Sequence, residues 1–233
     1  MKTTRTSLAF LLSAALAATA LAQSTPDAPR NKREAAAQWT EDGLQKAAIK
    51  GLDVAYVRPG VSLAAYNKVL LRPVAISFRR DWGRGSSGSP GVRVRAADAQ
   101  RIRDKLAALM REEAVKQLAK GGYAVVDKPG DDVLEVGAQI VDLYIIAPDV
   151  LGTEATRVYS VSAGEMTLVA ELRDSVSGEV AMRIYDHAYA RETGRPHRIT
   201  DAENAVEARR VASQWAEQLR RQLDLAKGKA AKK

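Results

Sequence analysis

The chain has 233 residues, of which 46% are hydrophobic, 27% are charged and none is cysteine. This composition excludes a disordered chain and a disulfide scaffold, and the missing thiols exclude cysteine catalysis, iron–sulfur clusters and CxxC zinc sites. A chain of this length can bury about 70% of the surface that its unfolded form exposes, which is enough for an ordinary core.

The N-terminal residues 1–22 have the pattern of a signal peptide. Lys2 and Arg5 make a basic start, an apolar stretch follows, and Ala20-Leu21-Ala22 is a small-x-small cleavage site. The apolar stretch is shorter than the roughly 20 residues that cross a bilayer, and no later stretch is long and apolar enough to do so. We therefore expect a periplasmic or secreted protein, cleaved between Ala22 and Gln23, with no transmembrane span after cleavage.

The signal peptide and the two ends of the mature chain together hold most of the net charge of +8. Residues 23–38 predict a disordered linker and residues 224–233 a basic disordered tail. Between them, residues 39–223 contain 27 basic and 25 acidic residues. Because a nucleic-acid site gathers basic residues on one face of a folded domain, we expect no specific nucleic-acid partner. The folded domain is expected over residues 39–223.

The first half of this domain predicts a strand, a loop and a helix. Residues 69–78 form an apolar run, in which Pro73 indicates an edge position or a bulge. Residues 79–95, here named the arginine loop, are rich in Gly, Ser and Arg and predict a long mobile loop. Residues 98–121 repeat apolar side chains at helical spacing and end at Gly121-Gly122, which favours a left-handed cap.

The second half predicts four strands and a helix. Residues 123–127 form a short strand, and residues 133–147 a long strand that is apolar on both faces. Alternating residues from Gly164 to Leu172, and again from Val180, predict a hairpin with one face buried. Thr200 and Glu203 form a capping box that begins the last helix. The order of elements predicts a single two-layer α+β domain, with about five strands in a mixed or antiparallel sheet and two long helices packed on one face.

The arginine loop is the first candidate binding site. Guanidinium groups can clamp phosphate or carboxylate bidentately, and a tryptophan can stack on a partner. The competing interpretation is a solvated loop, since Gly/Ser spacing does not preorganise the arginines. Residues 83–88 match GxGxxG, but they lie in mid-loop instead of joining a strand to a helix, which excludes a dinucleotide site. The candidates for an anion or a partner are Arg79, Arg80, Trp82, Arg84, Arg93 and Arg95.

The polar side of the hairpin is the second candidate. Strand alternation places His187 on the same side as Arg183, Tyr185 and Tyr189. With two histidines, no HExxH motif and no cysteine, the sequence predicts no metal site, and we expect no cofactor and no catalytic residue. Arg183, Tyr185 and His187 are therefore candidates for contact with a partner.

Two aspartates leave an alternative open. Asp142 and Asp186 interrupt strand patterns where an apolar residue would fit, and Asp186 falls on the buried side. Together with His187 they could carry out the acid–base chemistry of a periplasmic hydrolase, provided that the three groups converge in one pocket. The simpler interpretation is that each aspartate holds a neighbouring arginine or backbone amide.

Several segments in order carry a resemblance to a known family. They are residues 56–63, 66–74 and 78–82, followed by 132–134, 141–144, 147–149, 164–168 and 174–179. In this order they resemble the bacterial envelope family catalogued as domain of unknown function 3313, over about residues 43–223. The resemblance implies a small exported protein without an assigned activity or catalytic residues. Many members are lipoproteins, whereas this chain has Gln23 where a lipoprotein would carry cysteine.

The residues and the resemblance together favour a non-catalytic periplasmic binding or accessory protein. We expect it to dock an envelope protein through a sheet edge, the polar side of the hairpin or the arginine loop. The alternatives are the hydrolase described above and a binder of an anionic polymer that uses the arginine loop.

Overall fold

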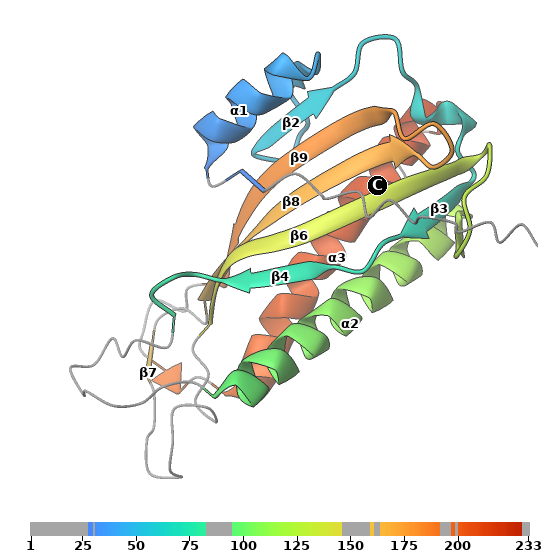
Figure 1. Ribbon diagram of the computed structural model, residues 1–233. Helices are drawn as coiled ribbons and strands as arrows, with labels where there is room; N and C mark the ends of the chain where they lie inside the picture. Colours follow the sequence, from blue (N-terminus) through green and yellow to red (C-terminus); the bar gives the residue numbers. More distant parts are fainter. Residues whose placement is uncertain are drawn as a thin grey trace, which may run out of the picture.

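The backbone is organised around a mixed β-sheet, with two long helices on one face and a short helix on the other (Figure 1). The computed structural model describes residues 28–29, 31–82, 95–145, 159–160, 164–191, 197–198 and 200–229. The elements are α1 (Lys32–Glu41), β1 (Gln45–Ala47), β2 (Val54–Val57), a 3-10 turn (Leu63–Ala65), β3 (Lys68–Leu71), β4 (Ala75–Phe78), α2 (Ala96–Gly121), β5 (Ala124–Val126), β6 (Val133–Ile145), β7 (Tyr159–Ser160), β8 (Gly164–Asp174), β9 (Val180–Tyr189), β10 (His197–Arg198) and α3 (Asp201–Ala226).

The three longest strands, β6, β8 and β9, form an antiparallel meander in the middle of the sheet. Antiparallel β2 and then β1 follow beyond β9. On the other side, β3 and β4 run parallel to successive parts of β6, and β5 runs parallel to β3. This confirms the α+β class, although the described sheet has eight strands where about five are predicted. The additional strands have three or four residues each, too few to show an alternating pattern.

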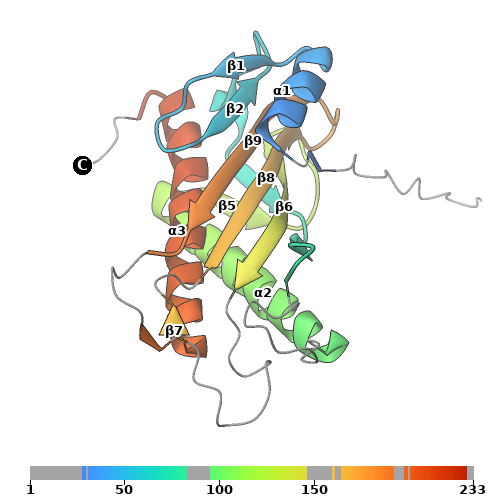
Figure 2. The ribbon, with the colours of Figure 1, turned by 90° about the vertical axis from the view of Figure 1, so that its left-hand side faces the viewer.

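Helices α2 and α3 cover one face of the sheet (Figure 2). Their apolar stripes, which include the fully buried Leu118 and Leu223, pack on the inward side chains of the central strands. Gly122 takes a left-handed φ of 79° at the end of α2, and the capping box of Thr200 and Glu203 begins α3, as predicted. Both long helices therefore begin and end close to where the sequence indicates.

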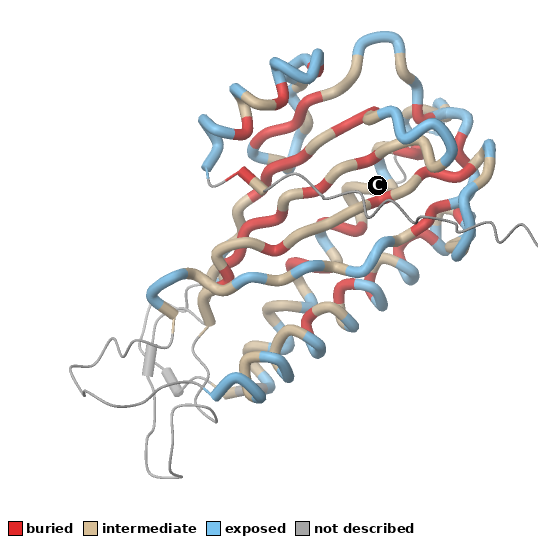
Figure 3. Tube along the Cα trace, in the orientation of Figure 1, coloured by how far each residue is buried: buried red, intermediate tan, exposed pale blue. Residues whose placement is uncertain are grey.

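Helix α1 lies on the opposite face, over β2 and β9. The Asn31 side chain accepts hydrogen bonds from the first free amides of the helix, and Ala35 and Trp39 are its buried residues. Trp39 meets Tyr56 edge to face, with 5.6 Å between ring centres. Residues 32–38, which the sequence assigns to a disordered linker over residues 23–38, are therefore helical. Two buried anchors in a mostly polar helix give a weak sequence signal, since exposed positions dominate α1 (Figure 3).

Irregular backbone marks the positions that interrupt the predicted strands. Pro73 lies between β3 and β4, so residues 69–78 form two short strands instead of one. Asp142 has a φ of 54° and lies in a bulge of β6, which explains why a polar residue interrupts this buried strand. At the C-terminus, α3 runs to Ala226, into the predicted tail, and Asp224 is buried, where it accepts a hydrogen bond of 2.9 Å from the Tyr123 hydroxyl.

Candidate functional site

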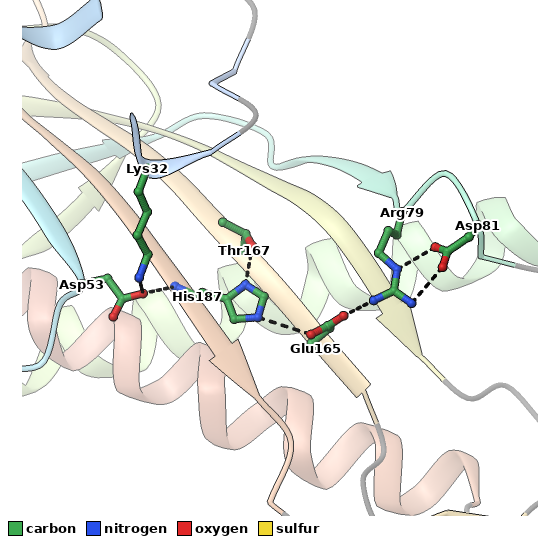
Figure 4. A network of polar contacts seen from close by, with 7 residues as sticks. All are labelled: Lys32, Asp53, Arg79, Asp81, Glu165, Thr167 and His187. Carbon is green, nitrogen blue, oxygen red and sulfur yellow. Dashed lines mark hydrogen bonds and ion pairs between the residues drawn. The ribbon is translucent and has the colours of Figure 1, made fainter. Parts of the chain in front are cut away.

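A chain of polar contacts crosses the sheet on the face opposite α2 and α3 (Figure 4). It begins at the first turn of α1, passes over β9 and β8, and ends just beyond β4. The members, in this order, are Lys32, Asp53, His187, Thr167, Glu165, Arg79 and Asp81. Helix α1, strands β8 and β9, and the segments just before β2 and just after β4 therefore contribute to one network.

His187 lies at the centre of this network. Its Nδ1 shares a hydrogen bond of 2.7 Å with the hydroxyl of Thr167, and its Nε2 lies 3.4 Å from a carboxylate oxygen of Glu165. The imidazole also meets the ring of Tyr189 edge to face at 4.4 Å. Nε2 is buried and makes no hydrogen bond with a described residue. Both ring nitrogens are therefore enclosed by the protein.

Asp53 joins the network to α1. One of its carboxylate oxygens lies 2.7 Å from Lys32 Nζ and accepts a hydrogen bond of 3.2 Å from the backbone N–H of His187. Burial alone would raise the pKa of Asp53, but the hydrogen bonds from Lys32 and His187 outweigh it and hold that pKa below its usual value. The same hydrogen bond raises the pKa of Lys32. This ion pair ties the first turn of α1 to β9.

Arg79 closes the other end of the network. It forms ion pairs with Glu165 and Asp81, and its guanidinium lies 3.9 Å from the centre of the Tyr144 ring. Nearby, Trp82 stacks on Phe78 with 3.8 Å between ring centres, and its indole N–H donates to a backbone carbonyl. Two candidates in the arginine loop thus make contacts within the protein.

The other arginine-loop candidates divide into two groups. Arg80 and Arg95 are exposed at the two ends of the loop. Arg84 and Arg93 lie outside the described residues, as do the GxGxxG match at residues 83–88 and the predicted cleavage site. Of these four, Arg80 and Arg95 are described, and neither belongs to the polar network.

On the hairpin, Arg183 donates to Glu171 at 2.6 Å and also pairs with Asp42, which follows α1. Arg173 pairs with the same glutamate. Tyr185 is not on an accessible polar surface, contrary to the prediction, because α1 covers it and leaves it 6% exposed. Burial raises the pKa of its hydroxyl. Strand alternation correctly indicates its side of the sheet, but not the helix above it.

Asp186 is buried on the opposite side of β9 from His187. One carboxylate oxygen accepts a hydrogen bond of 2.7 Å from the indole N–H of Trp215, and the other accepts one of 2.7 Å from the backbone N–H of Asp53. Burial raises the pKa of Asp186. Asp142 lies in the bulge of β6 described above. Asp186 and His187 therefore lie on opposite sides of β9, so the three groups do not converge in the one pocket that the hydrolase alternative requires.

The contacts of Thr167, His187 and Glu165 have the order of a nucleophile, a base and an orienting carboxylate. A nucleophile must reach its substrate, however, and Thr167 is 1% exposed while the far nitrogen of His187 is buried. Among the described residues, no group of three or more His, Asp or Glu side chains is placed to hold a metal ion. Thr167 is therefore not placed to act as a nucleophile, and its contact with His187 fixes both side chains in place.

Part of this network escapes sequence reasoning. Glu165 and Thr167 occupy outward positions of β8, and the alternation of polar and apolar residues around them is a usable signal. Lys32 and Asp53 lie in segments without a clear pattern, so their contact with β9 has no signal in the sequence. Of the predicted candidates, Arg79 and His187 belong to the network, whereas Arg183 lies with Glu171 and Asp42.

Residues 35–219, which include the sheet and every member of this network except Lys32, match a family model described as "Protein of unknown function (DUF3313)". The chain belongs to this family. No curated protein matches the DUF3313 chain. Within the part of the DUF3313 chain that the structure describes, no helix has the length and apolar character needed to cross a membrane.

Several solved structures are similar to the DUF3313 chain at low identity. A PelC dodecamer from Paraburkholderia phytofirmans has 13% identity and a TM-score of 0.35, and the match covers 69% of this chain and 94% of that one. Protein XCC0632 from Xanthomonas campestris has 16% identity and a TM-score of 0.35, over 70% and 86% of the two chains. A minor lipoprotein from Acinetobacter baumannii has 13% identity and a TM-score of 0.33, over 70% and 94%.

Proposed function

We propose that this protein is an exported, non-catalytic binding protein of the cell envelope. It docks a protein partner through the outward side of the β8–β9 hairpin, here named the polar face. The polar face consists of Glu165, Glu171, Arg173, Arg183, His187 and Tyr189. Export rests on the signal-peptide pattern of residues 1–22.

The observation that carries this proposal is the fixed arrangement of charged side chains on the polar face. Arg183, Glu171 and Arg173 hold one another by ion pairs, and Glu165 is held between His187 and Arg79. Side chains that are already ordered lose little conformational entropy when a partner binds. Such a surface can present a defined pattern of charge to a complementary protein.

Tyr189 supplies an exposed aromatic group at the end of this surface. It is 65% exposed, and its ring contacts the imidazole of His187 edge to face. Tyrosine is enriched at protein interfaces because it buries a large area and still presents a hydroxyl group. The outermost strands, β1 and β5, have only three residues each and offer a shorter template for a partner. We therefore favour the polar face over a sheet edge.

Site-specific photo-cross-linking in the native host tests this proposal. A photoreactive residue is introduced at Tyr189, and at Val206 as the matched control, because Val206 is 66% exposed on α3, on the other layer of the fold. We expect one envelope protein to cross-link from position 189 and not from position 206. The partner is then purified and its Kd measured with the native chain and with Tyr189→Ala.

Replacement of an aromatic residue that anchors an interface typically weakens binding by about 2 kcal/mol, or about 30-fold in Kd. Tyr189→Ala should show this loss with an unchanged Tm, while Val206→Ala should bind as the native chain does. Equal cross-linking from both positions, or an unchanged Kd in Tyr189→Ala, would contradict docking through the polar face.

A further inference from the structure

A cavity of about 580 Å³ lies between the sheet and the two long helices. Protein interiors are close-packed, and voids larger than a water molecule are few. Ligand pockets, by contrast, have volumes of about 300–1,000 Å³. A space of this size in the centre of the larger core is therefore the size of a ligand site, and all of its lining residues belong to the described part of the chain.

Small side chains create this space on both of its walls. The sheet forms the floor of the cavity, and the register places Ala138 of β6 directly opposite Ala170 of β8. Two small side chains side by side leave space above the sheet at this point. Two alanines one turn apart on α3, and others on α2, form the roof. The alanines that line the cavity include Ala107, Ala114, Ala138, Ala170, Ala212 and Ala216.

The remaining lining is apolar inside and polar at the rim. Leu168, Leu172 and Ile184 line the floor. Arg72 and Arg111 are exposed where the cavity meets the surface. A polar ligand needs buried hydrogen-bonding partners, whereas an apolar cavity favours apolar occupants. This distribution fits a hydrocarbon chain inside and a polar head group outside.

Two arginine contacts frame an entrance between α2 and the strands β3 and β4. Arg103 donates to the backbone carbonyl of Ile76 at 3.2 Å, and Arg111 donates to that of Leu71 at 3.3 Å. The two arginines are eight residues apart, which corresponds to about 12 Å along a helix. Ala108, between them, is exposed and also lines the cavity. Ala108 therefore marks the side of the cavity that is open to solvent between these two contacts.

From the lining, the volume and the entrance, we propose that this cavity binds a single-chain amphiphile of the fatty-acid class. The hydrocarbon chain lies among the alanines, and the carboxylate head lies at the rim near Arg72 and Arg111. The site lies on the opposite side of the sheet from the polar face, so this proposal does not depend on protein docking.

Binding of palmitate to the delipidated protein tests the proposal. The full-length gene is expressed with its own N-terminal segment, and a fluorescent fatty acid is displaced by palmitate. We expect saturable binding of one molecule per chain and a Tm that rises with palmitate concentration. Dodecanol, which has a neutral head, should bind more weakly than dodecanoate if the arginines hold the carboxylate.

Three variants locate the binding. Ala170→Leu fills the cavity and should weaken binding at least tenfold, with a Tm equal to or above that of the native chain. Ala119→Leu makes the same change at an exposed position of α2 and should bind normally. Ala108→Trp narrows the entrance without changing the core, and should slow association.

The outcomes that overturn the proposal are distinct from those for docking. Absence of palmitate binding to the native chain overturns it, whatever the polar face binds. Binding that is unchanged in folded Ala170→Leu and in Ala108→Trp also overturns it, since the ligand then lies elsewhere. A lower Tm in Ala170→Leu indicates that the space is already filled by side chains, and refutes the cavity itself.

Discussion

Replacement of Asp186 separates a structural role of this carboxylate from a catalytic one. The side chain accepts two hydrogen bonds of 2.7 Å, one from Trp215 and one from the backbone of Asp53. In Asp186→Ala both donors lose their partner inside the fold. A buried donor without a partner costs about 1–3 kcal/mol, so the two together cost roughly 4 kcal/mol. This is a large part of the 5–15 kcal/mol that stabilises a typical domain.

The loss is partly offset, because burial of the Asp186 carboxylate is itself unfavourable and raises its pKa. We therefore expect a net destabilisation of about 3 kcal/mol in Asp186→Ala at neutral pH. Urea unfolding followed by circular dichroism measures this difference. The variant Trp215→Phe keeps most of the packing and removes one of the two donors. In the double variant, Asp186→Ala with Trp215→Phe, that donor is no longer left without a partner. The double variant should therefore lose about 1 kcal/mol less than the sum of the two single losses.

The pH dependence gives an independent check. Because the native pKa of Asp186 is raised, the native state holds its proton to higher pH than the unfolded state does. The free energy of unfolding should therefore fall as pH rises from the usual value of 3.8 toward the raised pKa. In Asp186→Asn the side chain does not titrate, so this fall in the free energy of unfolding should be absent. If Asp186→Ala lies within about 0.5 kcal/mol of the native chain, the two hydrogen bonds do not stabilise the fold and our reasoning is wrong.

Three further predictions concern the rest of the fold. Glu113 is 1% exposed and pairs with Arg209 at 2.6 Å, so Arg209→Met should lower the stability measured by urea unfolding, and Glu113→Leu in the same chain should recover most of the loss. Burial and a hydrogen bond to Asp174 raise the pKa of Tyr66 to about 12. The native state therefore keeps this proton to higher pH than the unfolded state, and stability should fall as pH rises from 10 to 12. A series of Tm measurements against pH should show this fall, and a less steep one in Tyr66→Phe. Gly164 has a φ of 148° and an added Cβ would overlap a backbone oxygen, so Gly164→Ala should cost at least about 1 kcal/mol, whereas an equal Tm would contradict this.

The elements that the sequence identifies are those with long periodic patterns. Helix α2 is predicted at residues 98–121 and observed at Ala96–Gly121, because its apolar spacing and glycine cap are both local. The hairpin of β8 and β9 follows from alternation over ten or more residues. Helix α1 and the short strands β1 and β2 depend on contacts with distant parts of the chain, and a local pattern does not report such contacts.

The candidate site shows the same limit. Alternation correctly places Asp186 inside and His187 outside, but it cannot show that Trp215 satisfies the carboxylate from α3. Nor can it show that α1 covers Tyr185. Arg79 is singled out as a possible anion ligand because of its charge, whereas its partners Glu165 and Asp81 come from the folded arrangement. Strand alternation predicts which side of the sheet a residue faces, whereas tertiary packing determines which residues it contacts.

The pairing of the sheet has a consequence for the order in which the protein is made. β2 pairs with β9, and β3 and β4 pair with β6, so the N-terminal strands find their partners only in later parts of the chain. β6, β8 and β9 are neighbours in the sequence as well as in the sheet, and local pairings of this kind form fastest. β2 can pair early with the short β1, but its other edge gains its partner only when β9 has been synthesised. Until then this edge of β2 is open, and an open strand edge in an incomplete chain favours aggregation.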